Sequence, residues 1–167
     1  AELDDLVTLG RERGVPVLND LGSGCLLDTA QYGLAPEPTV QQSVDAGVEL
    51  SFFSGDKLIG GPQAGIVAGQ GEWIERLARH PLARAVRIDK MGLAALSATL
   101  TSFLKEKAHE EVPVWRMISM SADRAAETAD SWRKAIDSPD VRIRGGNSTV
   151  GGGSLPGETS PTTLLAI

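Results

Sequence analysis

The chain has 167 residues, of which 41% are hydrophobic and 23% are charged, and its formal net charge is −6. This composition excludes an intrinsically disordered chain and a free-standing nucleic-acid binder with a basic surface. The single cysteine, Cys25, excludes an internal disulfide and a cysteine-rich metal site, and His80 and His109 lie too far apart for a zinc motif. No apolar run reaches the length of a membrane span, so we expect a cytoplasmic protein.

The first half of the sequence predicts helices that alternate with short apolar strands. The predicted helices cover residues 2–13, 38–47 and 72–79. The predicted strands cover residues 15–20, 48–55 and 64–69. Gly14 and Gly47 stand where helix C-caps are expected. This alternation is typical of an α/β protein with a mainly parallel sheet.

The pattern changes near residue 90, where we place a boundary between a sheet core (1–90) and a smaller α+β unit (91–167). Two strong helices are predicted there, over residues 91–107 and 121–137, the second with Ser121 as its N-cap. Three short strands separated by glycine turns follow, in "VRIRGG", "STVGGGS" and "TTLLAI". Because the chain lacks an initiator methionine and stops inside a predicted strand, we interpret it as an incomplete piece of a larger protein.

One lysine lies in an unusual setting, the glycine-rich turn "SGDKLIGGPQAG" of residues 54–65. Pyridoxal phosphate needs a lysine for its Schiff base, an acid beside its ring nitrogen, and hydroxyl or N–H groups for its phosphate. Lys57, Asp20 and Ser54 are candidates for these three roles, in that order. Asp20 and Lys57 each follow the end of a predicted strand, and ligands of α/β sheets bind at the carboxyl ends of the strands.

Each of these residues also has an ordinary structural interpretation. A strand-end aspartate often forms a turn, Ser54 is typical of a turn hydroxyl, and Lys57 by itself is typical of a surface side chain. The combination of acid, serine, lysine and glycine-rich turn favours the cofactor site. Phosphate-loop motifs and a Ser–His–Asp triad find no support, because the glycines and histidines lack the required spacing.

Four blocks carry a family resemblance: "DLGSGCLLD", "SFFSGDKLIGGPQAGIVAG", "HPLARAVRIDKMGLAALSATL" and "VGGGSLPGETSP". Together, in this order, they resemble the bacterial selenocysteine synthases, the L-seryl-tRNA(Sec) selenium transferases. The resemblance covers the middle and later part of the family's length. It does not include the family's N-terminal region, with its tRNA-contacting domain, or the C-terminal end of its small domain.

The resemblance implies a fold-type-I pyridoxal phosphate enzyme, with residues 1–90 as the second half of the cofactor-binding large domain. Residues 91–167 would then be an incomplete small α+β domain. It also implies Lys57 as the Schiff-base lysine, Asp20 as the partner of the ring nitrogen, and assembly into a homo-oligomer.

The implied reaction converts L-seryl-tRNA(Sec) to L-selenocysteinyl-tRNA(Sec), by loss of the serine hydroxyl and addition of selenium from selenophosphate. Arg84 and Arg87 are implied to hold the anionic donor, whose oxygens match guanidinium groups, and Asp56 to position or protonate a reacting group. On the residues alone, solvated helix charges are the slightly favoured interpretation of the two arginines, and the resemblance reverses this preference. Two other functions stay open: a related pyridoxal phosphate lyase acting on a small amino acid or amino sugar acid, and an inactive interaction fragment.

Overall fold

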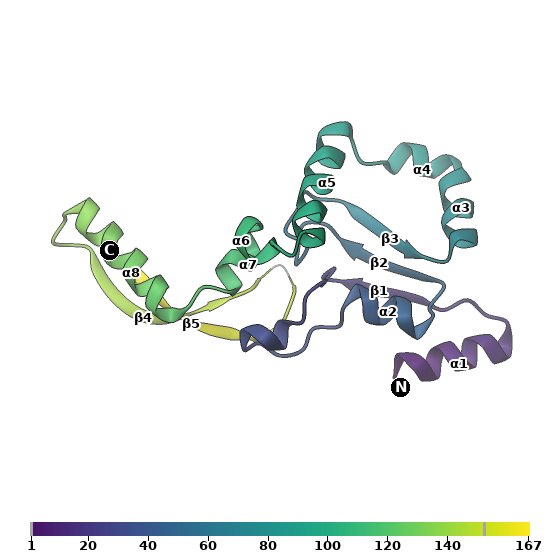
Figure 1. The fold of residues 1–167 in the computed structure, drawn as a ribbon, viewed down its shortest axis with the longest axis horizontal. Helices are drawn as coiled ribbons and strands as arrows, with labels where there is room; N and C mark the ends of the chain where they lie inside the picture. The colour runs from purple at the N-terminus through teal and green to yellow at the C-terminus, as the bar shows by residue number, and fades with distance from the viewer. Residues whose placement is uncertain (1, 152) are drawn as a thin grey trace.

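The computed structural model describes residues 2–151 and 153–167, which form a mixed α/β chain with two separate sheets (Figure 1). The helices are α1 (Leu3–Arg13), η1 (Thr29–Tyr32), α2 (Val40–Ala46), α3 (Gly71–Arg79), α4 (Pro81–Val86), α5 (Lys90–Leu104), α6 (Ala108–Glu111), α7 (Pro113–Ile118) and α8 (Ala122–Ile136). The strands are β1 (Leu18–Gly22), β2 (Leu50–Ser54), β3 (Gly65–Gly69), β4 (Arg142–Thr149) and β5 (Thr159–Ala166). In the described part of the chain, no helix has the length and apolar character needed to cross a bilayer.

The first sheet has the strand order β1-β2-β3 and is only partly parallel. β1 and β2 are parallel, as predicted for these two strands, and Asp20 pairs with Phe52. The prediction that Asp20 follows the end of its strand is wrong, because β1 continues to Gly22 and Asp20 lies inside it. β3 is antiparallel to β2, which corrects the prediction of a mainly parallel sheet. The reason lies in residues 55–64, which form a turn too short for the crossover that a parallel strand requires.

The two faces of this sheet have different surroundings. On one face the amide of Asn19 donates to the Ser43 hydroxyl of α2 (2.9 Å), and Leu96 of α5 packs with Phe53. Phe52 points to the other face, because successive side chains of a strand alternate. That second face looks toward α3 and α4, which Figure 1 shows curving beside β3.

Several predicted helix ends are confirmed by their backbone geometry. Gly14 and Gly47 both adopt the left-handed conformation that ends a helix, with φ of 63° and 86°. The first predicted strand is wrong at its start, because β1 begins at Leu18 rather than at residue 15. It is also not buried, since β1 is the edge strand of the sheet and Leu18 is 55% exposed.

The later part of the chain forms a second layer, in which α8 packs on the β4–β5 hairpin, while α6 and α7 lie between this hairpin and the first sheet (Figure 1). The sequence predicted a turn at Gly145 and Gly146, but β4 runs through both, paired in register with Thr163 and Thr162. Continuous pairing along β5 thus overrides the weak strand propensity of glycine. The domain boundary near residue 90 stays a prediction.

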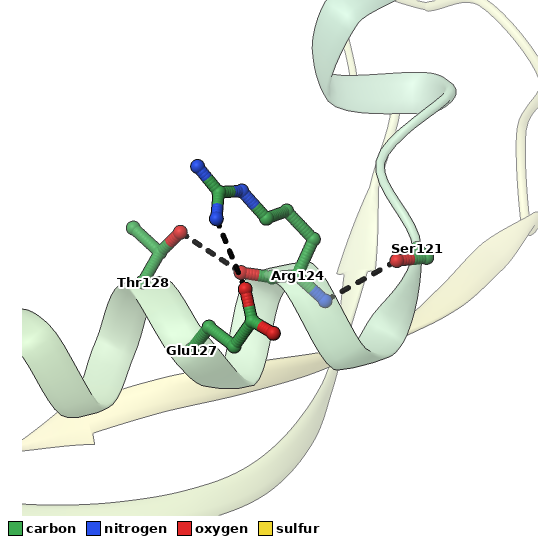
Figure 2. Close-up of polar contacts among 4 residues, drawn as sticks. All are labelled: Ser121, Arg124, Glu127 and Thr128. Carbon is green, nitrogen blue, oxygen red and sulfur yellow. Dashed lines mark hydrogen bonds and ion pairs between the residues drawn. The ribbon is translucent and has the colours of Figure 1, made fainter.

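The N-cap of α8 gives a first testable consequence. The Ser121 hydroxyl accepts the N–H of Arg124 (3.2 Å), and Arg124 also pairs with Glu127 on the exposed face of the helix (Figure 2). We expect Ser121→Ala to lower the opening free energy of the first turn of α8 by about 1 kcal/mol, because it removes a helix cap. Hydrogen exchange of α8 peptides measures this change. The matched variant Glu127→Ala should cost only about 0.3 kcal/mol, since it breaks an exposed ion pair, and an equal loss in the two variants would contradict the assignment.

Candidate active site

The turn that carries Lys57 is fixed by hydrogen bonds to distant parts of the chain. The N–H of Leu58 donates to the carbonyl of Ser23 (3.0 Å), in the loop after β1. The carbonyl of Leu58 accepts the indole N–H of Trp115, from α7, at 2.6 Å. Gly61 closes the turn by donating to the carbonyl of Gly55 (2.8 Å). The residue after the lysine therefore has both of its backbone polar groups bonded, each to a different element.

Side-chain packing also holds the turn that carries Lys57 in place. Leu58 is buried in a cluster with Cys25 and Trp115, whereas the next residue, Ile59, is buried in the cluster of the sheet. Gly60 has φ of 72°, and a Cβ atom there would lie 2.5 Å from a methyl group of Val112. Glycine is required at this point both by the backbone conformation and by the close approach of α7.

Lys57 lies on the same face of the sheet as Asp20. The Lys57 ammonium donates to the Ser54 hydroxyl at 2.9 Å. Ser54 and Phe52 share a face because they are two residues apart on β2, and Asp20 shares it because it pairs with Phe52. From strand spacing and rise, the backbone positions of Asp20 and Ser54 are roughly 8 Å apart. Asp20 is exposed, and one of its carboxylate oxygens accepts the N–H of Gly22 (3.1 Å).

The remaining predicted residues lie in different places. Arg87 ends α4 and lines an apolar groove of about 700 Å³, whose opposite wall includes Phe52. Arg84 is exposed within α4 and, among the described residues, does not belong to the wall of this groove. Asp56 is exposed and lines a second hollow, beside Lys57. The structure therefore brings Asp20, Ser54 and Lys57 to one face of the sheet. Arg87 lines a groove beside Phe52 on that face, but the wall of this groove does not include these three residues, and Arg84 lies outside it.

Cys25 is close to the lysine turn but is sealed from solvent. Its thiol donates to the carbonyl of Leu27 (3.0 Å), and its side chain packs against Leu58 with no exposed surface. Burial raises the pKa of the Cys25 thiol from 9.0 to about 11. A protonated, enclosed thiol is a poor nucleophile, so we assign Cys25 a structural role.

This burial predicts slow alkylation of Cys25. At pH 8 the raised pKa alone reduces the thiolate fraction about 100-fold relative to an unfolded thiol. We expect iodoacetamide to label Cys25 at least that much more slowly in native protein than in urea, as measured by mass spectrometry of its peptide. Because the folded pKa is the higher one, this thiol favours the folded state fully below pH 9, and the effect fades as the pH rises toward 11. Equal labelling rates in native and unfolded protein would contradict the burial of this side chain.

Two contributors to the site had no role assigned from the sequence. Trp115 lies outside the motifs named from the sequence, and nothing local indicates its bond to Leu58, 57 residues away. Ser154 lines the hollow beside Lys57 from the loop between β4 and β5. Its only sequence signal is the block "VGGGSLP", which has no predicted chemistry of its own.

The fold and the site together define a mixed α/β protein with a lysine and an acid on the same face of two parallel strands. A family model described as "L-seryl-tRNA selenium transferase" (SelA) matches residues 1–167. The chain belongs to this family. It is 52% identical to the L-seryl-tRNA(Sec) selenium transferase of Nitratidesulfovibrio vulgaris, 50% to that of Geobacter metallireducens and 42% to that of Clostridium perfringens.

These alignments cover 98–99% of this chain but only 36–37% of each relative, so the chain spans just over a third of their length. Among solved structures, the chain is similar to "D-Glucosaminate-6-phosphate Ammonia-lyase", with a TM-score of 0.58 over 93% of this chain and 35% of the other. The sequence identity is 16%, so this similarity supports the fold only.

Proposed function

We propose that this chain acts within a longer protein that converts L-seryl-tRNA(Sec) to L-selenocysteinyl-tRNA(Sec), with pyridoxal phosphate as cofactor and selenophosphate as selenium donor. The observation that carries the proposal is the position of the Lys57 ammonium, bonded to Ser54 above the same sheet face as Asp20. Membership of the selenium transferase family supports the choice of reaction. In this proposal, the chain forms part of the catalytic region of a fold-type-I enzyme.

The residues present fit pyridoxal phosphate. The backbone positions of Asp20 and Ser54 are roughly 8 Å apart on one face, and Ser54 holds the Lys57 amine, which leaves room for a pyridine ring between the amine and the carboxylate. Ser54 adds a hydroxyl beside the amine. When bound, the cofactor supplies an electron sink, which permits loss of the α-proton and then of the β-hydroxyl from an attached seryl group.

Each of the four site residues would then have a defined role. The Lys57 amine holds the cofactor aldehyde and, when free, accepts the α-proton of the seryl group. The Asp20 carboxylate holds a proton on the ring nitrogen. The Ser54 hydroxyl orients the Lys57 amine, and Asp56 lies where it can exchange a proton with the leaving hydroxyl. We assign Asp56 this role because it lines the same hollow as Lys57.

The complete protein provides the direct test. It should form selenocysteinyl-tRNA(Sec) from seryl-tRNA(Sec) and selenophosphate, as detected by incorporation of radioactive selenium into aminoacyl-tRNA. Conversion of a free amino acid or amino sugar acid, with no selenium incorporated, would favour the lyase instead. Absence of both activities, and of an absorbance band from bound cofactor, would favour an interaction fragment. We expect the active form to be a cytoplasmic homo-oligomer whose other regions bind most of the tRNA.

The two arginines should differ in their effects. Because Arg87 lines the groove on the Lys57 face and Arg84 does not, Arg87→Ala should raise the KM for selenophosphate more than Arg84→Ala does. Loss of a charge-assisted hydrogen bond of about 1.5–3 kcal/mol corresponds to a rise in KM of roughly 10- to 150-fold for Arg87→Ala. Steady-state kinetics with varied selenophosphate measure both variants. Equal effects, or a larger effect at Arg84, would contradict this placement of the donor.

A further inference from the structure

The two peptide units that follow Lys57 are both held by hydrogen bonds. In the first unit, the carbonyl of Lys57 accepts the N–H of Gly60 at 2.9 Å, and the N–H of Leu58 donates to the carbonyl of Ser23 at 3.0 Å. The second unit is held through the carbonyl of Leu58, which accepts the indole N–H of Trp115 at 2.6 Å. The backbone next to the lysine therefore cannot rotate without the loss of at least one of these bonds.

The bond from Trp115 is the only one of the three that a side chain makes, so a substitution can remove it selectively. It lies in the interior of the protein, because Trp115 has no exposed surface and Leu58 is 1% exposed. A buried carbonyl without a partner is unfavourable. Loss of the indole N–H is therefore expected to displace the peptide unit that carries the Leu58 carbonyl.

The two bonds of Leu58 also tie the lysine turn to two other elements. Ser23 lies in the loop that follows β1, the strand that contains Asp20, whereas Trp115 belongs to α7. The position of the turn relative to β1 thus depends on a contact made from the later part of the chain.

The Lys57 side chain depends on this backbone for its own position. Its amine makes one hydrogen bond among the residues that the structure describes, to the Ser54 hydroxyl at 2.9 Å. Its long aliphatic stem has many rotamers, so a change in the direction of the backbone moves the amine away from Ser54. Misplacement of a reacting group by about 1 Å can cost roughly 10²-fold in rate.

We propose that Trp115 is a positioning residue for the reaction. Its indole N–H acts through the Leu58 carbonyl to keep the Lys57 amine beside Ser54. The amine then stays on the sheet face of Asp20, where the aldehyde of the cofactor can reach it. This inference rests on the proposed function. A residue with only a structural role would stabilise the fold without affecting how fast the folded protein binds an aldehyde at Lys57.

The test compares two steps of cofactor binding in the complete, cofactor-free protein, under conditions where circular dichroism shows that each variant is folded. The first is the dissociation constant for pyridoxine phosphate, which lacks the aldehyde and so cannot attach to a lysine. The second is the rate at which pyridoxal phosphate attaches to Lys57, stopped by borohydride and measured by mass spectrometry of the Lys57 peptide. Attachment to Lys134, on the exposed side of α8, is the internal standard.

We expect Trp115→Phe to slow attachment at Lys57 by about 10- to 100-fold, and to leave attachment at Lys134 and the binding of pyridoxine phosphate unchanged. A second variant carries at position 115 the benzothienyl analogue of tryptophan, in which sulfur replaces the indole N–H. It keeps the ring shape, so it should show the same slow attachment even if Trp115→Phe does not fold. The matched control is Ile118→Ala, which removes packing from the same cluster and helix but keeps the bond to Leu58, and it should attach the cofactor at the normal rate.

The inference is overturned if both variants at position 115 attach the cofactor at the normal rate. It is equally overturned if they weaken pyridoxine phosphate binding as much as they slow attachment, or if Ile118→Ala slows attachment to the same extent, since either pattern indicates a structural role only. The proposed function fails separately, if the unmodified protein attaches no cofactor to Lys57.

Discussion

Replacement of Lys57 by alanine in the complete protein is expected to lower kcat for selenocysteinyl-tRNA(Sec) formation by about 10²- to 10⁴-fold, the usual contribution of an acid–base group. The reason is that one amine both attaches the cofactor and moves the α-proton. Borohydride reduction of the unmodified protein with pyridoxal phosphate should fix the cofactor to the peptide that contains Lys57. Mass spectrometry of that peptide identifies the attachment site.

Lys57→Arg is the matched variant, because arginine keeps the positive charge near Ser54 but forms no Schiff base. It should be as inactive as Lys57→Ala, and neither variant should retain cofactor after reduction. If Lys57→Arg kept most of the activity, Lys57 would act only through its charge. If borohydride fixed the cofactor to another lysine, the site would have to be placed elsewhere.

The largest expected effect on stability belongs to Trp115. Its side chain has no exposed surface, it packs against Tyr32, and its indole N–H bonds the carbonyl of Leu58. Trp115→Ala should lower the free energy of unfolding of this region by about 3–5 kcal/mol, because it leaves a large cavity. Hydrogen exchange of peptides from residues 55–65, measured at increasing urea concentration, reports the loss of unfolding free energy directly at the lysine turn.

Trp115→Phe separates packing from hydrogen bonding. Phenylalanine retains an aromatic ring but leaves the buried Leu58 carbonyl without its partner, so we expect a loss of about 1–3 kcal/mol. Trp132, which is 60% exposed on α8, is the control, and Trp132→Phe should change stability by less than about 0.5 kcal/mol. Equal effects at Trp115 and Trp132 would show that the Leu58 contact does not stabilise the turn.

Most helices of this fold are predictable from the sequence because their ends carry local signals. Gly14 and Gly47 mark C-caps and Ser121 marks an N-cap, and all three act within a few residues of the helix they end. The strands were less predictable, because strand limits depend on the partner strand. β4 continues through Gly145 only because β5 pairs with it, and β3 runs antiparallel because of the short turn before it.

In the candidate site, too, features with local sequence signals were predictable, whereas features that depend on distant contacts were not. Asp20 and Lys57 were expected together at one sheet edge, and the parallel pairing of β1 and β2 puts Asp20 on the same face as Ser54, which bonds Lys57. Asp20 nevertheless lies within β1 rather than after its end. The bond from Trp115 to Leu58 was not predictable, since no local pattern links residues so far apart in the chain. The same holds for Ser154, which reaches the hollow beside Lys57 only through the folded β4–β5 loop.

The burial of Leu58 and Ile59 in different clusters has a mechanical consequence for the lysine turn. Adjacent Cα atoms are about 3.8 Å apart, so this peptide unit links the packing around α7 to the packing of the sheet, as the side chain of Phe103 also does. Close-packed interiors transmit displacement rather than absorb it. Any shift of one cluster relative to the other therefore acts on the peptide next to Lys57, which places this side chain at the junction of the two clusters.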